Sequence, residues 1–277
     1  MNNPEIRPLL LRETAEIAFT EIKRFVETRL TADFHLRRVS APLCLPAGSG
    51  LGGPAPHITF PAAGSGRMME IVSGLDLWLR SQLERYDSAP GFGVFTVMNA
   101  LRPEVAETAI SSPHITSWAW QQVMPEEPIT PRKALSESSR HIYALLRDTE
   151  KMILEKFPHL SPALPEEFAV IEAAEVAAAE PADDFLRSRY IYLRERPHTA
   201  VFIINEESEE ETAMPAEAQG SVSGTLAVWN HMVRTTLNLA DISIFPAVSH
   251  NDTASIGGNI WRDKVALHIL HQTEILK

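Results

Sequence analysis

Two alternating segments separated by a proline-containing loop are the feature that most restricts the fold of this chain. Apolar and polar residues alternate over Gly93–Leu101 and again over His114–Gln121, which predicts two half-buried antiparallel strands. Pro103 ends the first strand, because proline cannot donate a ladder hydrogen bond. Arg102 lies at that end, and its planar guanidinium can give two parallel hydrogen bonds to a phosphate or a carboxylate. The sequence therefore predicts an anion-binding arginine at the end of a sheet.

The rest of the chain alternates between helical and strand-like patterns. Helices are predicted over Arg7–Leu30, from Ser73, over Ala134–Phe157, in the alanine-rich stretch near residue 175 and over His231–Leu239. Strands are predicted over His35–Leu45, Thr199–Asn205 and Gly224–Asn230, and IGGNIWRDKVALHILHQ is interpreted as a glycine turn opening a last helix. No repeat or long linker divides the chain, so we expect one α+β domain over residues 1–277.

Composition excludes several classes of function. The formal net charge of −11 disfavours general binding to nucleic acid phosphates. Cys44 is the only cysteine, which excludes an intrachain disulfide and a cysteine-rich zinc site. There is no apolar run of about 18–20 residues that could cross a membrane, and the N-terminus lacks the pattern of a secretory signal. We expect a soluble, cytoplasmic protein without nucleic acid or membrane partners.

Several motifs together resemble a known family. They are ALRP at residues 100–103 paired with SWAW at 117–120, the opening helix followed by HLRRVSAPL, SGLDLWLRSQL, AVWN and IGGNIW. In this order they resemble the ammonia-dependent asparagine synthetase (aspartate–ammonia ligase) family, relatives of the class II aminoacyl-tRNA synthetase core. The resemblance covers most of the chain and implies an antiparallel sheet flanked by helices. It also implies a homodimer formed through the opening helix and the strand after it.

The resemblance assigns roles to five residues. Arg102 would hold the α-phosphate of ATP and the acyl carboxylate, and Lys264 stands where the family has a second arginine. Gly257 and Gly258 would belong to the nucleotide-binding glycine turn. Asn238 stands at the position of a magnesium-binding glutamate, where its amide oxygen could still bind a cation. ATP and magnesium are therefore the implied cofactors, and the acidic run at residues 206–211 is a further candidate for metal binding.

Other positions depart from the family pattern. Gly53, Leu79, Ser117 and Ala119 stand where the family has charged or polar groups that contact aspartate, and Thr225 replaces an aspartate. Unpaired substrate charges cost several kcal/mol. We therefore expect an acid other than L-aspartate in a less charged pocket.

Other side chains have structural interpretations. Trp118 and Trp120 lie opposite Ser117 and Ala119 by period-two alternation, which predicts that they belong to the core. His268 and His271 are interpreted as a solvent-facing pair on the last helix.

Two classes of function remain from these patterns. The first is an ATP-dependent ligase that adenylates a small carboxylic or amino acid and passes the acyl group to ammonia or an amine. The alternative is a non-catalytic synthetase paralogue that binds a metabolite or a partner and regulates. A tRNA synthetase proper is a weaker interpretation, because the opening helix starts near residue 1 and the sequence is acidic.

Overall fold

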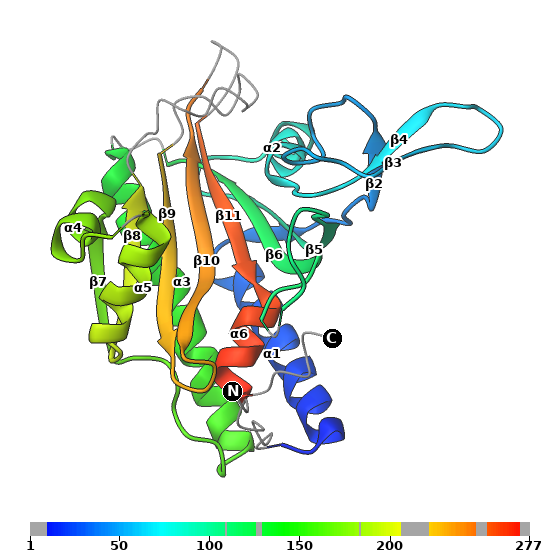
Figure 1. The fold of residues 1–277 in the computed structure, drawn as a ribbon. Helices are drawn as coiled ribbons and strands as arrows, with labels where there is room; N and C mark the ends of the chain where they lie inside the picture. Colours follow the sequence, from blue (N-terminus) through cyan, green and yellow to red (C-terminus); the bar gives the residue numbers. More distant parts are fainter. Residues whose placement is uncertain are drawn as a thin grey trace.

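An eight-stranded sheet forms the centre of the structure (Figure 1), a computed structural model that describes residues 10–108, 110–125, 129–182, 184–205, 222–247 and 254–271. The strand order is β1-β5-β6-β11-β10-β9-β8-β7. Most neighbours are antiparallel, but the edge strands β1 and β7 run parallel to β5 and β8. The strands are β1 (Leu36–Arg38), β5 (Gly93–Leu101), β6 (His114–Val123), β7 (Glu167–Glu172), β8 (Thr199–Asn205), β9 (Val222–Asn230), β10 (Thr235–Phe245) and β11 (Ser255–Trp261).

Helices cover the two faces of this sheet differently. One face packs against α1 (Arg12–Ala32), α3 (Pro131–Lys156) and α6 (Arg262–Leu270) in the main hydrophobic core. The other face carries α2 (Asp76–Arg85) over β5 and β6, and α4 (Ala173–Ala179) and α5 (Phe185–Glu195) near β7 to β10. Among the described residues, no helix is long and apolar enough to cross a lipid bilayer.

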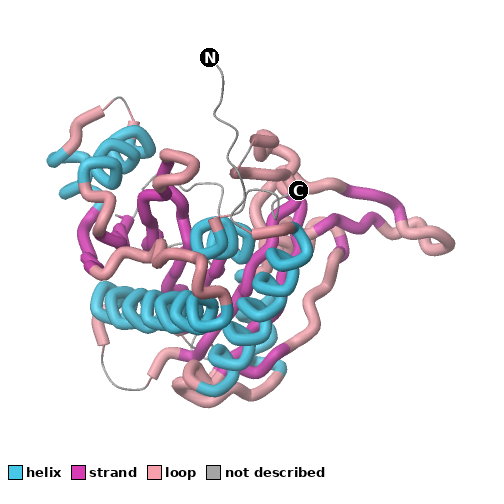
Figure 2. The backbone as a smooth tube through the Cα atoms, turned by 90° about the horizontal axis from the view of Figure 1, so that it is seen from below, coloured by secondary structure: helices cyan, strands magenta, loops and turns pink. Residues whose placement is uncertain are grey.

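A small second sheet projects from this body as an arm (Figures 1 and 2). It consists of β2 (Cys44–Pro46), β4 (Met68–Ile71) and β3 (Thr59–Pro61), in that order. Leu43, Phe60 and Met68 expose apolar side chains on or beside it. The sequence analysis did not predict the β3–β4 hairpin.

The predicted strand pair is confirmed. Residues Gly93 to Leu101 pair antiparallel with residues 122 down to 114. Trp118 and Trp120 are both buried in the core on the α1 side, as their alternation predicted. The long third helix is also confirmed, and it begins where Thr130 caps the backbone amide of Lys133.

Three predicted elements are wrong. Residues 235–245, which include most of the predicted helix His231–Leu239, form strand β10, and a turn with Arg234 at φ 52° joins it to β9. Gly257 and Gly258 lie inside strand β11 rather than in a turn. The predicted strand His35–Leu45 is two short strands in different sheets.

Close strand packing explains the two glycines. A Cβ on Gly257 would lie 2.4 Å from the carbonyl oxygen of Trp120, and a Cβ on Gly258 would lie 1.9 Å from that of Asp241. Both distances are far below van der Waals contact, so no other residue fits without moving the neighbouring strands.

Candidate functional site

Polar side chains gather on one face of the sheet centre. Strand register places Ser117 and Gln121 of β6, Asn259 of β11, Asp241 of β10 and Thr225 of β9 on the same face. We call these five residues the polar face. The helices α2 and α5 pack on its two flanks. The strands between them are therefore the part of this face where a ligand can reach the sheet.

A β-bulge brings a second β10 residue to the polar face. The register with β9 shifts between Asn238 and Ala240. Residues three apart normally lie on opposite faces of a strand, but the extra residue places Asn238 and Asp241 on the same side. Both side chains line one cavity.

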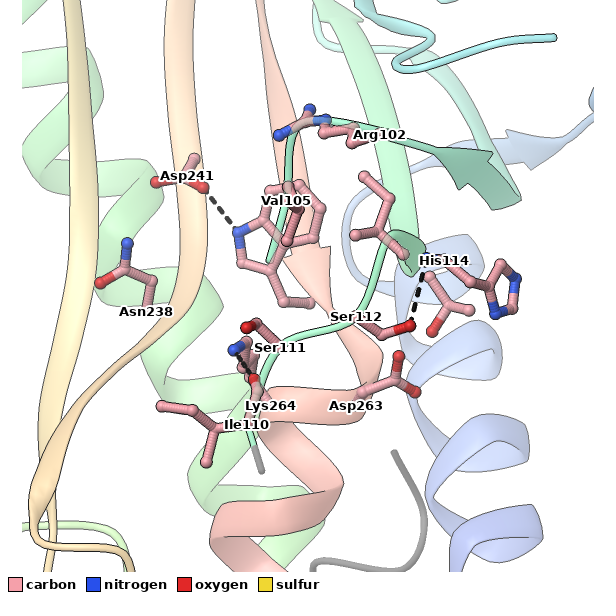
Figure 3. A pocket seen from close by; sticks show the side chains of 13 residues that line it. Arg102, Val105, Ile110, Ser111, Ser112, His114, Asn238, Asp241, Asp263 and Lys264 are labelled. Atoms are coloured by element: carbon pink, nitrogen blue, oxygen red, sulfur yellow. Dashed lines mark hydrogen bonds between the residues drawn. The ribbon is translucent and has the colours of Figure 1, made fainter. Parts of the chain in front are cut away.

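That cavity has a volume of about 250 Å³ (Figure 3). Its lining comes from the β5–β6 loop, the start of β6, β10, the end of β11 and the start of α6: Arg102, Val105, Ile110, Ser111, Ser112, His114, Ile115, Thr116, Asn238, Asp241, Trp261, Asp263 and Lys264. The structure thus brings together Arg102, Asn238 and Lys264, which are far apart in sequence. Pockets for drug-sized ligands usually measure about 300–1,000 Å³, so a nucleotide would need the loop over this one to move.

Arg102 is positioned for anion binding at the top of this cavity in Figure 3. Its Nε donates to the carbonyl oxygen of Ser73 at 2.9 Å. The guanidinium lies 5.7 Å from the ring centre of Trp261, and in Figure 3 it extends toward the side of the cavity that holds Asp241. Its two terminal nitrogens have no hydrogen-bond acceptor in the part of the chain that the structure describes. The fork therefore remains available for a ligand.

Asp241 is the carboxylate at the centre of the polar face. Thr225 Oγ1 donates to its Oδ1 at 2.7 Å, and Trp261 Nε1 donates to its Oδ2 at 2.6 Å. Desolvation raises the pKa of Asp241, although these two donors and the charges of Arg189 and Arg102 act in the opposite direction. Protein contacts alone thus do not compensate the loss of hydration.

Asp76, at the start of α2, is a second carboxylate near Arg102. Asn259 Nδ2 donates to its Oδ1 at 3.1 Å, and Ser117 Oγ donates to Asn259 Oδ1 at 2.8 Å. Burial raises the pKa of Asp76, and the positive charge of Arg102 is the main opposing influence. The sequence analysis assigned no role to Asp76, although the motif SGLDLWLRSQL contains it, or to Asp241, which belongs to no motif. The strand pairing of β10 with β11 brings these two carboxylates together.

Lys264 lies at the lower end of the cavity in Figure 3. Its Nζ donates to the carbonyl oxygen of Ile110 in the β5–β6 loop. Burial lowers the pKa of Lys264 and raises that of its neighbour Asp263. Lys264 therefore holds the loop that covers the cavity, and an incoming phosphate would compete with Ile110 for its ammonium group.

The four residues predicted as substrate contacts lie beside the cavity rather than in its lining. Leu79 and Ala119 are fully buried in the cluster under α2. Ser117 is bonded to Asn259 on the polar face. Gly53, at φ 91°, lies so close to Gly74 that a Cβ would come within 2.3 Å of its backbone nitrogen. Gly53 thus supports the segment of Ser73 that accepts from Arg102.

The described residues do not build a magnesium centre. No group of three or more His, Cys, Asp or Glu side chains converges in the described part of the chain. Asn238 offers a neutral amide oxygen, and both oxygens of the nearby Asp241 already accept hydrogen bonds. Magnesium prefers carboxylate, phosphate and water oxygens, so an ion here would depend on phosphate and water ligands. The acidic run at residues 206–211 lies outside the described residues.

A second cavity of about 610 Å³ lies at the other end of α6. His268 lines it and is buried, so the prediction of a solvent-facing histidine is wrong at this position. Its Nε2 lies 3.0 Å from the carbonyl oxygen of Ala163, and its Nδ1 lies 2.9 Å from Asn230 Nδ2. These contacts tie α6 to β9 and to the loop after α3.

The architecture defines a class II synthetase-like protein. Asparaginyl-tRNA synthetase from Pyrococcus horikoshii, solved with asparaginyl-adenylate, superposes with a TM-score of 0.68 at 9% identity, covering 95% of this chain and 66% of that one. The enzyme from Entamoeba histolytica, also solved with asparaginyl-adenylate, gives a TM-score of 0.68 at 11% identity, covering 95% of this chain and 65% of that one. At these identities the likeness shows the fold alone.

Sequence comparison identifies the family within that class. A model of the aspartate–ammonia ligase family matches residues 13–254. The aspartate–ammonia ligase of Bacillus cytotoxicus is 31% identical over 246 residues, which cover 85% of this chain and 74% of the relative. That of Clostridium perfringens is 36% identical over 176 residues, covering 61% of this chain and about half (52%) of the relative. The chain therefore belongs to the aspartate–ammonia ligase family, as its motifs predicted.

Proposed function

We propose that this protein is an ATP-dependent, AMP-forming ligase that converts a carboxylic acid into an amide with ammonia or an amine. The observation that carries this proposal is Arg102, whose free guanidinium fork lies in a cavity that also holds Lys264. Family membership supports the same reaction. No feature of the cavity favours the non-catalytic alternative.

The site chemistry suits carboxylate activation. In such a reaction a carboxylate oxygen attacks the α-phosphorus of ATP and pyrophosphate leaves, giving an acyl-adenylate. The nitrogen lone pair of ammonia or an amine then attacks the acyl carbon, AMP leaves and the nitrogen loses a proton. A fixed guanidinium neutralises the negative charge that collects between carboxylate and phosphate, and Arg102 is placed for that role. Lys264 would hold a terminal phosphate, with magnesium entering as its complex with ATP.

The expectation of an acid other than L-aspartate has no support from these findings. It rested on the missing charges at Gly53, Leu79, Ser117 and Ala119. The structure supplies charges near Arg102 from other positions, namely Asp76 and Asp241. An amino acid could therefore find a partner for its ammonium group, and we propose an amino acid, aspartate included, as the substrate class.

Substitution of Arg102 tests the proposal. Arg102→Ala should lower the rate of acid-dependent AMP formation by about 10²–10³-fold, and Arg102→Lys should retain part of it, because it keeps the charge and loses the fork. Arg85→Ala, at an exposed arginine of α2, is the matched control and should leave the rate unchanged. Unchanged AMP formation in Arg102→Ala, with the melting temperature preserved, would contradict the proposal.

Quaternary structure and location are proposed on the same basis. Leu11, which directly precedes α1, is 81% exposed and Ile17 of α1 is 53% exposed, which fits a helix whose outer face meets a second copy of the chain. We propose a homodimer in the cytoplasm.

A further inference from the structure

Ser73, whose carbonyl oxygen accepts from Arg102 Nε, is itself held by a glycine-rich segment at residues 48–54, which we call the glycine segment. The backbone N–H of Ser73 donates to the carbonyl oxygen of Gly52 at 2.7 Å. Its hydroxyl donates to the carbonyl oxygen of Pro54 at 2.6 Å. Because Ser73 is only 1% exposed, its position follows that of the glycine segment. The direction of the Arg102 fork therefore depends on where this segment lies.

His57 fastens the glycine segment to strand β4 of the arm. Its Nε2 lies 3.0 Å from the carbonyl oxygen of Gly53, and its Nδ1 lies 3.1 Å from Oε2 of Glu70. Glu70 is 3% exposed, and the same oxygen accepts from the backbone N–H of Gly48 at 3.1 Å. A Cβ on Gly52 would lie 2.7 Å from the other carboxylate oxygen, so the segment folds closely around Glu70. The His57 ring thus connects the arm to the segment that holds the anchor of Arg102.

Both contacts of the His57 ring need a hydrogen on the nitrogen. A carbonyl oxygen and an ionised carboxylate can only accept, whereas a neutral imidazole carries a single N–H. The two contacts therefore need one proton more than a neutral ring beside an ionised carboxylate has, whichever of the two groups holds it. Among the described residues, Glu70 is the only charged side chain with a hydrogen bond or ion pair to His57. The proton is therefore held within this pair.

Arg102 depends on a single anchor. The bond to Ser73 is the only hydrogen bond of the Arg102 side chain in the part of the chain that the structure describes. A catalytic group that is misplaced by about 1 Å can lose about 10²-fold in rate. A shift of the glycine segment would reach the guanidinium through Ser73, and no second hydrogen bond would hold the fork in place.

We propose that His57 is a positioning residue: together with Glu70 it holds one proton that fastens the glycine segment, and the fastened segment orients Arg102 through Ser73. Loss of the proton removes one of the two contacts of the ring and frees the segment to move. Neither His57 nor Glu70 lines the cavity, so the pair acts on the site from the arm. This inference rests on the proposed ligase function and adds control of its rate by protonation outside the cavity.

Amide substitutions separate the two contacts of the ring. His57→Gln places an amide nitrogen near the position of Nε2, so it can still donate to Gly53. His57→Asn places the amide nitrogen near Nδ1, so it can donate only to Glu70, and His57→Ala removes both contacts. His159→Ala, at an exposed histidine that lines neither cavity, is the matched control.

ATP–pyrophosphate exchange measures the effect on the reaction. His57→Ala and His57→Asn should lower kcat by about 10–100-fold, whereas His57→Gln should retain most of the rate and His159→Ala should match wild type. The loss should appear in kcat rather than in KM for ATP, because Arg102 acts on charge that develops in the transition state. Glutamine does not titrate, so the rate of wild type relative to His57→Gln should fall between about pH 6 and about pH 9 as the pair loses its proton.

Hydrogen–deuterium exchange tests the same contacts without turnover. The backbone amides of Ser73 and Gly74 both donate to the carbonyl oxygen of Gly52. They should exchange about 10-fold faster in His57→Ala than in wild type, as expected when about 1 kcal/mol of hydrogen bonding is lost. His159→Ala should exchange like wild type, and the melting temperature of each variant shows that it is folded.

Two results would overturn the inference: unchanged exchange of these amides in His57→Ala, or a ratio of wild-type to His57→Gln rates that does not depend on pH. The two methods also separate the inference from the proposed function. Faster amide exchange in His57→Ala, in a protein whose wild type shows no ATP–pyrophosphate exchange, would support the inferred contacts and refute the ligase. Equal ATP–pyrophosphate exchange in wild type and His57→Ala would support the ligase and refute the inference.

Discussion

Burial of the charged residues on and beside the polar face lowers the stability of the free protein. Burial disfavours the charged form of Asp76, Asp241 and Arg189, as their pKa shifts indicate. Uncompensated charge of this kind is common where a protein binds a charged ligand, and it trades stability for function. The site is therefore expected to gain stability when its ligand arrives.

Substitution of Asp241 should reveal that cost. Folding raises the pKa of Asp241, so the folded protein holds this proton more tightly than the unfolded chain. The contribution of Asp241 to the free energy of unfolding is therefore largest below the unfolded pKa, and it is lost as the pH rises through the folded pKa. Asp241→Asn keeps the shape and cannot ionise, so it should melt a few degrees above wild type at pH 7–8, at about 2–4 °C per kcal/mol. The difference in melting temperature should shrink near pH 3–4. The affinity of Asp241→Asn for an amino acid should be lower than that of wild type.

Thermal melts across this pH range check the prediction, with Thr225→Ser, which keeps the hydroxyl that donates to Asp241, as the conservative control. A variant less stable than wild type at pH 8 would show that Asp241 is a structural group rather than a binding one.

Residues of the site differed in how far the sequence could predict them. The position of Arg102 could be predicted, because the alternating pattern and Pro103 mark the end of its strand. Asp241 was not, because the expected helix over His231–Leu239 concealed the β10–β11 pairing. The β-bulge that brings Asn238 beside Asp241 has no sequence signal that single-chain patterns provide. The charge that Arg189 places near Asp241 could not be predicted either, because α5 itself was not predicted.

At the scale of elements, strands were not predicted where polar residues or glycines interrupt the alternation of apolar residues. The segment TTLNLADISIF alternates only if the bulge is allowed for, so helical spacing seemed to fit its start. In IGGNIW, glycine was interpreted as turn chemistry, whereas the structure uses it for close approach between strands. The strands β5, β6 and β8 were predicted correctly because their apolar patterns are uninterrupted.

His268 of helix α6 should make the free energy of unfolding depend on pH. Its Nε2 faces a carbonyl oxygen, which can only accept, so the ring is held as the tautomer with hydrogen on Nε2. Burial lowers the pKa of His268 to about 4. The neutral ring contributes its full stability above about pH 6.5, and this is lost as the pH falls toward the folded pKa. The largest change that this titration can make in the free energy of unfolding is about 3 kcal/mol.

Chemical denaturation at pH 7.5 and 4.5 would measure this. The advantage of wild type over His268→Gln should shrink markedly at the lower pH, whereas the exposed His231→Gln should show no such change. An advantage independent of pH would mean that folding does not lower the pKa of His268.

At the scale of the molecule, the order of motifs predicted the class II synthetase-like fold and the family. The strands, α1 and α3 carry most of these motifs. Their sequence patterns can be recognised because each of these elements buries one apolar face in the core. The placement of α4, α5 and the projecting arm could not be predicted, because these segments pack on the sheet through few apolar residues.

Dimerisation through α1 is the prediction that belongs to this scale. Ile17→Asp would place a charge in the proposed apolar interface, so it should give a monomer at micromolar concentration, since a desolvated charge is costly. Leu186→Asp, which makes the same type of change at an exposed apolar residue of α5, is the control and should remain dimeric. Sedimentation velocity distinguishes the two states. A wild-type protein that sediments as a monomer would refute the proposed dimer.

The most direct test of the central claim is ATP–pyrophosphate exchange by the wild-type protein with magnesium and pooled amino and carboxylic acids. The account predicts exchange that requires an acid, is strongest with amino acids and is lost in Arg102→Ala. Folded wild-type protein that shows no exchange with any pool would contradict it.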